Sequence, residues 1–173
     1  MAGTANRWKV VVGAVLIQLC LGAIYAWSVF TPALKDEGGW SKLSTQVVFS
    51  VGLATFAIVM VFAGRKLNDW GPQRLAMMGG ITLGVGYFLA GLGDGMNFFT
   101  VLVGVGLIGG AGIGLAYVVP IAVGMRWFPD HKGMITGAAV AGFGFGALGW
   151  VKLAGSWGQL IDRIGLDGTF MAY

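Results

Sequence analysis

The chain has 173 residues, of which 57% are hydrophobic and 10% are charged, and glycine occupies 32 positions. A soluble domain of this size uses about 25% charged residues, so a mean hydropathy of +0.81 predicts that most of the chain lies in lipid. The 11 Lys and Arg residues outnumber the 7 Asp and Glu residues, but they are scattered in ones and twos. Because no basic patch could follow a phosphate backbone, a nucleic-acid-binding module is excluded.

Long uncharged stretches divide the chain into membrane spans. A helix needs roughly 20 residues to cross about 30 Å of hydrocarbon. Stretches of this kind lie at residues 10–34, 43–64, 75–93, 95–125 and 133–151. We expect a short external loop at residues 95–97, continuation of the fifth span past Lys152 toward Ile161, and a sixth helix that begins at Thr169. The predicted fold is an all-α integral membrane protein with five transmembrane helices and the start of a sixth.

The first span follows Arg7 and Lys9, as the apolar region of a secretory signal peptide would. A signal peptide has an apolar region of about 7–15 residues and a small-residue cleavage site. The stretch at residues 10–34 is longer and contains Thr31-Pro32 near its end. We therefore expect a retained helix, in which the single cysteine, Cys20, is a small buried residue.

The distribution of Lys and Arg predicts the orientation, because cytoplasmic loops are enriched in both. The amino-terminal segment and the second and fourth loops hold Arg7, Lys9, Arg65, Lys66, Arg74, Arg126 and Lys132, whereas the other loops hold Lys35, Lys42 and Arg163. This asymmetry predicts a multi-pass cell-membrane protein with a cytoplasmic amino terminus. Tryptophans, which favour the headgroup layer, lie beside the span boundaries at Trp8, Trp40, Trp70 and Trp127.

Glycines four residues apart recur along the spans. They lie at positions 80/84, 106/110/114, 133/137 and 142/146. Small residues at this spacing let helix backbones approach closely in lipid. We expect tight packing of the spans, and the same glycines could also serve as hinges between helices that rock against each other.

The sequence contains a match to the dinucleotide-binding fingerprint, but not in the structural context that this motif requires. Gly104-Val105-Gly106-Leu107-Ile108-Gly109 follows an apolar run, and Asp130 comes about 20 residues later. The motif lies inside a stretch of membrane length rather than in a βαβ unit, which leaves a membrane-embedded nucleotide-dependent reductase as a weak alternative. The single histidine, His131, has no serine or cysteine partner within the spans, so we expect no catalytic residues, cofactor or metal.

Polar and aromatic residues within the spans are the candidate ligand contacts. Gln18 and Tyr25 are seven residues apart, so on a regular helix they share a face. Tyr117 lies on the fourth span and Phe143 on the fifth. A polar face in a membrane helix turns toward another helix or a water-filled cavity. These four residues form the predicted substrate cavity, although interhelical hydrogen bonding is an equally good explanation for Gln18.

The second loop reads Gly64-Arg65-Lys66-Leu67-Asn68-Asp69-Trp70-Gly71-Pro72-Gln73-Arg74. It resembles the signature of the major facilitator superfamily between helices two and three, in which a glycine is followed by an acidic residue, a basic residue, and a second glycine with further basic residues. Gly64, Gly71 and Arg74 fit this signature. Asn68 stands where the family usually has Asp, and Asp69 stands where it usually has Arg or Lys.

The fourth loop narrows the resemblance to one branch. Three segments carry this narrower resemblance, namely Arg126-Trp127-Phe128-Pro129-Asp130-His131-Lys132-Gly133, the run at residues 141–144, and Ala23-Ile24-Tyr25-Ala26-Trp27-Ser28 on helix one. Together they look like the oxalate/formate antiporter and monocarboxylate transporter branch. The resemblance implies two six-helix halves around a central cavity and alternating access. It further implies that residues 1–173 form the amino-terminal helical bundle, that the carboxy-terminal half is absent, and that Tyr25 and Tyr117 match cavity-lining tyrosines.

The function implied is secondary active transport of small carboxylates. Two versions remain open, namely proton-coupled symport of a monocarboxylate such as lactate or pyruvate, and anion exchange of the oxalate/formate type. The expected partners are a small organic anion, a proton in the symport version, the lipid bilayer and the protein's own carboxy-terminal half. A small self-assembling membrane channel or semi-transporter is the alternative.

Charges at the inner ends of helices two to five form a predicted cytoplasmic gate. The charged residues are Asp69, Arg74, Arg126, Asp130 and Lys132. Opposite charges there can pair in one state of the transport cycle and separate in the other. Because Asn68 replaces the usual acid, we expect Asp69 to provide the acidic partner. Solvated loop charges that only fix the topology are the simpler alternative.

Overall fold

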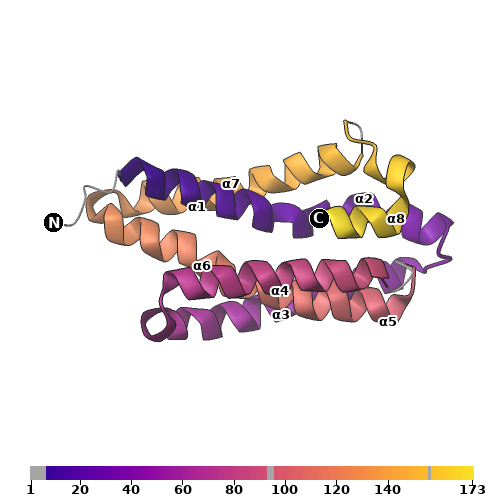
Figure 1. Ribbon diagram of the computed structural model, residues 1–173, viewed down its shortest axis with the longest axis horizontal. Coiled ribbons are helices and arrows are strands. Elements are labelled where there is room, and N and C mark those ends of the chain that lie inside the picture. The colour runs from indigo at the N-terminus through magenta and orange to yellow at the C-terminus, as the bar shows by residue number, and fades with distance from the viewer. Residues whose placement is uncertain (1–6, 93–95, 156) are drawn as a thin grey trace.

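The computed structural model describes residues 7–92, 96–155 and 157–173, and every regular element among them is a helix (Figure 1). Helical segments long and apolar enough to cross a membrane are Trp8–Asp36, Lys42–Trp70, Pro72–Leu92, Phe98–Trp127 and Pro129–Ala154. The predicted all-α membrane fold with five spans is therefore confirmed.

The first span is not one regular helix. It consists of α1 (Arg7–Leu21), a 3-10 turn, η1 (Gly22–Ala26), and α2 (Trp27–Asp36). At the break the chain approaches the fifth span closely, because a Cβ atom on Gly22 would collide with the carbonyl oxygen of Phe143. Cys20, just before the break, is exposed rather than buried, so the expectation of a buried cysteine is wrong.

The second and third spans are α3 (Lys42–Trp70) and α4 (Pro72–Leu92), separated by one residue. Ser41 caps the start of α3 by accepting a hydrogen bond from the Ser44 amide at 3.0 Å. Gly71 ends the helix with φ at +80°, a conformation that costs glycine little. Pro72 then opens α4, where the missing N–H removes no intrahelical bond. The Gly71 of the predicted signature thus makes the sharp turn.

The fourth span combines α5 (Phe98–Val101), a π-helical segment, η2 (Leu102–Gly109), and α6 (Gly110–Trp127). Asn97 caps α5, accepting hydrogen bonds from two backbone amides. Met96 and Asn97 lie outside the helices, as predicted for the loop at residues 95–97. Residue 95 of that loop and residue 93, the predicted end of the third span, lie outside the described part of the chain. The Gly104–Gly109 fingerprint lies in η2, within a membrane span, and not at a strand-to-helix turn.

The fifth span comprises η3 (Pro129–His131) and α7 (Lys132–Ala154), and α8 (Leu160–Ala172) follows. Two expectations are wrong here. The fifth span does not continue toward Ile161, because the chain turns back after Ala154 and the Trp157 amide donates to the carbonyl of Lys152 at 2.8 Å. The sixth helix begins at Leu160 rather than Thr169, with a break at Gly165, where φ is +74°.

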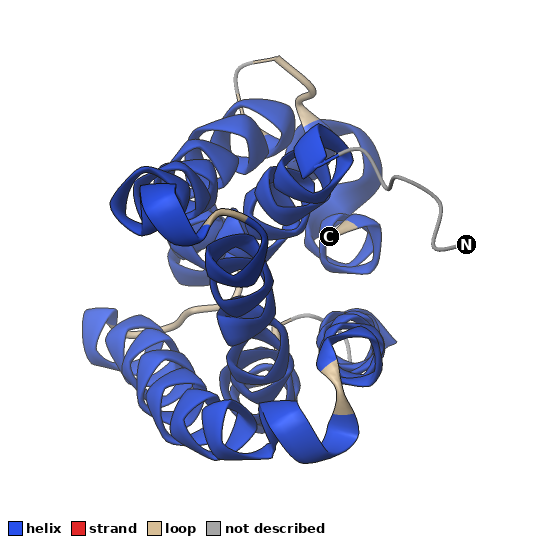
Figure 2. Ribbon diagram, turned by 90° about the vertical axis from the view of Figure 1, so that its left-hand side faces the viewer, coloured by secondary structure: helices blue, strands red, loops and turns tan. Residues whose placement is uncertain are grey.

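The fourth span lies at the centre of the bundle. Its α6 contacts α3 and α4 on one side and α1 and α7 on the other. In Figure 1, α1, α2, α7 and α8 run along one side and α3, α4 and α5 along the other, and the end-on view shows the same two groups (Figure 2). The start of α1 and the α3–α4 and α6–α7 connections meet at one end of the bundle.

The predicted glycine pairs differ in whether they pack closely against another helix. Gly110 packs against Gly52, Gly114 against the Phe56 backbone, and Gly146 against Leu19, so that helices touch closely at these points. For these pairs, tight packing is confirmed. Around the glycines at positions 80, 84, 133 and 137 there is open space within the described part of the chain, so the packing expectation is wrong for those pairs inside this bundle.

Candidate functional site

Two tyrosines from different spans flank one phenylalanine. Tyr25 on η1 meets Phe143 on α7 edge-on, with ring centroids 5.3 Å apart and an interplanar angle of 72°. Tyr117 on α6 meets the same ring at 5.0 Å and 73°. The structure thus brings together three of the four residues predicted for the substrate cavity. Edge-to-face aromatic pairs favour defined ring orientations, so Phe143 fixes where both phenol groups lie.

Residues of α3 complete this aromatic cluster. Phe49 lies 6.4 Å from Tyr25, and Phe56 lies 5.2 Å from Tyr117, between ring centroids. Phe49 and Phe56 are seven residues apart and therefore share a face of α3. Neither was predicted from the sequence, because two phenylalanines in an uncharged span carry no signal beyond their spacing.

The two phenol hydroxyls are available to a ligand. Phe143 is only 6% exposed, whereas Tyr25 is 43% exposed and Tyr117 is half-buried. Within the described part of the chain, neither hydroxyl has a hydrogen-bond partner. A phenol can donate one hydrogen bond to an anion while its ring packs on an apolar group.

Gln18 does not belong to the same surface as Tyr25. It is fully buried, its Nε2 donates to the backbone carbonyl of Tyr117 at 3.5 Å, and its Oε1 is buried without a partner. The expectation of a shared face assumes a continuous α-helix, whereas the 3-10 turn winds at 3.0 rather than 3.6 residues per turn and rotates Tyr25, its fourth residue, by about 80°. In this structure Gln18 makes the interhelical contact that was the open alternative.

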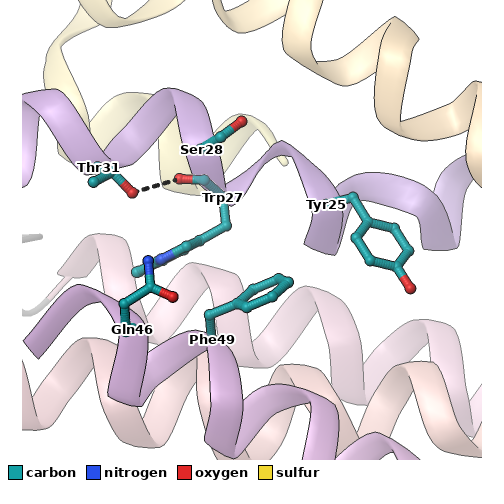
Figure 3. Close-up of a pocket in the computed structure, with 6 residues that line it drawn as sticks. All are labelled: Tyr25, Trp27, Ser28, Thr31, Gln46 and Phe49. Atoms are coloured by element: carbon teal, nitrogen blue, oxygen red, sulfur yellow. Dashed lines mark hydrogen bonds between the residues drawn. The ribbon is translucent and has the colours of Figure 1, made fainter. Parts of the chain in front are cut away.

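A cavity of about 300 Å³ opens beside Tyr25. Figure 3 shows its lining, which is Tyr25, Trp27, Ser28, Thr31, Gln46 and Phe49. The indole of Trp27 is held by its N–H, which donates to the Thr45 carbonyl at 3.0 Å, and the Thr31 hydroxyl donates to the Trp27 carbonyl at 3.2 Å. The lining carries hydroxyl and amide groups but no charged side chain. This cavity can therefore orient an anion but cannot neutralise it.

One residue of this cavity, Tyr25, was predicted from the sequence. Gln46 and Thr31 were missed, although both are polar residues within apolar spans. Their positions gave a usable signal, because a polar side chain in a span must face another helix or a cavity. What the sequence could not supply is that the two helices place them on opposite walls of one space.

At the end of the bundle where α3 meets α6, the interhelical contact is made by Asn68. Its Oδ1 accepts a hydrogen bond from Nη2 of Arg126 at 2.5 Å. Asp69 instead pairs with Lys66 of its own helix at 3.1 Å, where Asp69 is exposed and Lys66 is partly exposed. The expectation that Asp69 replaces the family's acid across the helix interface does not hold in this structure.

The remaining residues of the predicted gate lie at the same end. Arg74 is in the first turn of α4, Asp130 is in η3 and Lys132 begins α7, all three exposed. Gly64 lies on α3 and faces Val118 of α6 at the limit of contact. Among the predicted gate residues that the structure describes, the hydrogen bond between two helices is the one from Arg126 to Asn68.

Comparison with known proteins identifies the family. Residues 11–171 match the sequence profile of the Major Facilitator Superfamily. The chain belongs to this superfamily. It is 34% identical to the uncharacterized MFS-type transporter YhjX of Escherichia coli over 97% of the chain and 40% of that protein. It is 30% identical to the oxalate:formate antiporter of Oxalobacter formigenes over 96% of the chain and 38% of that protein.

A third relative belongs to a eukaryote. The chain is 33% identical to apicoplast pyruvate carrier 1 of Toxoplasma gondii, over 83% of the chain and 34% of the carrier. The chain thus spans two fifths or less of the length of these relatives. The resemblance to the oxalate/formate antiporter and monocarboxylate transporter branch is confirmed, and the superfamily consists of transporters rather than enzymes.

Proposed function

We propose that this chain is the amino-terminal helical bundle of a secondary transporter of small carboxylates that works by alternating access. The observation that carries the proposal is the pair of phenol groups, Tyr25 and Tyr117, held around Phe143 next to a cavity of about 300 Å³. A cavity of this size suits a small organic acid. The relatives named for oxalate, formate and pyruvate agree with that substrate class.

The chemistry of the site assigns different parts of a carboxylate to different groups. The phenol hydroxyls and the neutral polar groups of the cavity donate hydrogen bonds to the carboxylate oxygens. The rings of Phe49 and Trp27 pack against the apolar remainder. Because the cavity lining carries no cation, the negative charge must be balanced elsewhere, and we assign this task to the carboxy-terminal half against which the bundle packs in the whole transporter.

The same residues bear on the choice between symport and exchange. The cavity lining and the aromatic cluster contain no Asp, Glu, His or Lys that could carry a proton near neutral pH. Exchange of one carboxylate for another needs no such group, so the described part of the chain favours exchange. Proton symport would require the proton to bind elsewhere in the transporter or to travel on the substrate.

A self-assembling channel or semi-transporter is the second candidate, supported by the exposed glycines at positions 133 and 137, which leave room for another helix. Counterflow distinguishes the two. The protein, expressed from its natural reading frame, is reconstituted in liposomes preloaded with unlabelled oxalate or lactate. A transporter accumulates labelled carboxylate against its gradient, whereas a channel only equilibrates it. Absence of accumulation for every small carboxylate would reject the proposed function.

A further inference from the structure

The break in the first span leaves a backbone carbonyl that needs a hydrogen-bond donor. The last four carbonyls of an α-helix have no partner within the helix, and α1 ends at Leu21, so the carbonyl of Leu19 is among them. In a bilayer, water cannot satisfy such a group, and each unsatisfied one is costly. The break can persist only if other helices supply donors.

Trp150 on α7 supplies the donor. Its indole N–H donates to the Leu19 carbonyl at 3.1 Å, across 131 residues of sequence. Gly146, one turn earlier on α7, permits the approach, because a Cβ atom there would collide with the same carbonyl oxygen. The contact is thus built from two residues of α7, one that donates and one that makes room.

The indole is itself held in place from the other side. The hydroxyl of Tyr173 donates to the Trp150 carbonyl at 2.7 Å, and the two rings lie 4.7 Å apart. Trp150 is also seven residues after Phe143, on the same face of α7. One face of α7 therefore contacts the first span on both sides of the break, with Trp150 at Leu19 and Phe143 at Tyr25.

We propose that Trp150 is a positioning residue that holds the first span in its broken form and thereby keeps Tyr25 against Phe143, where it can contact the substrate. Without the indole donor, the Leu19 carbonyl is best satisfied by the Ala23 amide in a regular α-helix. That change from 3-10 to α winding turns Tyr25, the fourth residue of the turn, by about 80° around the helix axis. The effect on substrate rests on the proposed function, whereas the effect on the break does not.

The first test is Trp150→Phe, which removes the N–H donor and keeps an aromatic ring beside Tyr173. Trp157→Phe is the matched control, because Trp157 is 75% exposed and lies after the end of α7. In the counterflow assay, we expect Trp150→Phe to raise the KM for carboxylate about tenfold, as loss of a hydrogen bond to a charged group would. The control variant keeps the wild-type KM.

A double variant separates positioning from general damage. If Trp150 acts through Tyr25, Trp150→Phe adds no further increase in KM to Tyr25→Phe, because the hydroxyl it positions is already gone. If the increases in KM of the two single variants instead multiply in the double variant, the proposal is wrong. An unchanged KM in Trp150→Phe alone would overturn it as well.

A second readout needs no transport activity. In a Cys20→Ser background, a cysteine replaces Ser28, which is exposed, follows the break and lines the cavity beside Tyr25. Because loss of the 3-10 winding turns this position by about 100°, we expect a membrane-permeant maleimide to label it several-fold more slowly with Trp150→Phe than without it or with Trp157→Phe. An equal labelling rate would show that the break does not depend on the indole. If counterflow fails for all carboxylates, this measurement still decides the role of Trp150.

Discussion

Asn68 and Asp69 are neighbours in the chain with different partners. Asn68 connects α3 to α6 through Arg126, whereas Asp69 makes an exposed pair with Lys66 one turn away on the same helix. Exposed pairs of this kind contribute about 0.2–1 kcal/mol. Only the contact from Asn68 joins two helices, so we propose that Asn68, and not Asp69, biases the balance between the inward-facing and outward-facing states.

The prediction is that Asn68→Leu shifts this balance and Asp69→Asn does not. Loss of one interhelical hydrogen bond, about 0.5–1.5 kcal/mol, changes a two-state ratio by roughly two- to tenfold. The ratio is measured in a Cys20→Ser background as the relative labelling of cysteines placed at Ser28 and Met134, toward opposite ends of the bundle. Equal ratios in both variants and wild type would leave the loop charges with a topological role only.

The sequence predicted which of these residues lie together more reliably than it predicted how their side chains are oriented. It selected Tyr25, Tyr117 and Phe143, because polar or aromatic groups between helices stand out in apolar spans. It placed Gln18 with Tyr25 because seven residues are nearly two turns of an α-helix. That argument depends on one winding throughout, and the 3-10 turn at Gly22–Ala26 arises from contact with α7, which the local sequence does not reveal.

At the scale of helices, the close approach of α1 and α7 depends on particular glycines. Gly146 touches the backbone of Leu19, whereas Gly144, two residues earlier, has open space around it in the described structure. In a helix interior, alanine is usually more favourable than glycine by about 0.5–1 kcal/mol. At Gly146 the added methyl group must instead push two backbones apart, at a cost of about 1–3 kcal/mol.

We therefore predict opposite effects from the same substitution. Gly146→Ala lowers the thermal unfolding midpoint of the detergent-solubilised protein, and Gly144→Ala leaves it unchanged or raises it. The two variants differ only in which face of α7 carries the methyl group. A midpoint for Gly146→Ala equal to that of Gly144→Ala would mean that α1 and α7 do not meet as closely as described.

The span lengths were predictable and the irregular segments were not. Hydropathy locates all five spans, because the bilayer thickness sets the number of apolar residues required. The π-helical Leu102–Gly109, the end of α7 at Ala154 and the early start of α8 at Leu160 depend on tertiary contacts and on backbone turns at single residues. The composition is apolar on both sides of Leu102–Gly109, so the sequence gives no boundary there, whereas Gly155 and Gly158 after α7 are a helix-stop signal that hydropathy alone does not use.

For the whole molecule, charge asymmetry suggests the orientation in the membrane. The start of α1 and the α3–α4 and α6–α7 connections share one end of the bundle (Figure 1), and seven of the eleven Lys and Arg residues belong to these segments. Because basic residues remain on the cytoplasmic side, we propose that this end faces the cytoplasm.

Single-cysteine labelling tests the orientation. In a Cys20→Ser background, an impermeant thiol reagent added to intact cells is expected to label Lys35→Cys and to leave Lys66→Cys and Lys132→Cys unlabelled. Lys35 is the matched control, since it is an exposed lysine at the opposite end of the bundle. Labelling of positions 66 and 132 from outside, with position 35 protected, would mean that the protein has the opposite orientation.

The central claim is that the hydroxyls of Tyr25 and Tyr117 bind the carboxylate of a transported substrate. Its most direct test is the carboxylate concentration dependence of counterflow for Tyr25→Phe and Tyr117→Phe. Tyr87→Phe is the control, because it removes the same hydroxyl group from a tyrosine that is buried against Phe170 and Tyr173. Loss of a hydrogen bond to a charged group costs about 1.5–3 kcal/mol, so each of the two variants should bind carboxylate roughly tenfold to hundredfold more weakly, and the control should match wild type. Unchanged affinity in both Tyr25→Phe and Tyr117→Phe would contradict the account and make these tyrosines structural.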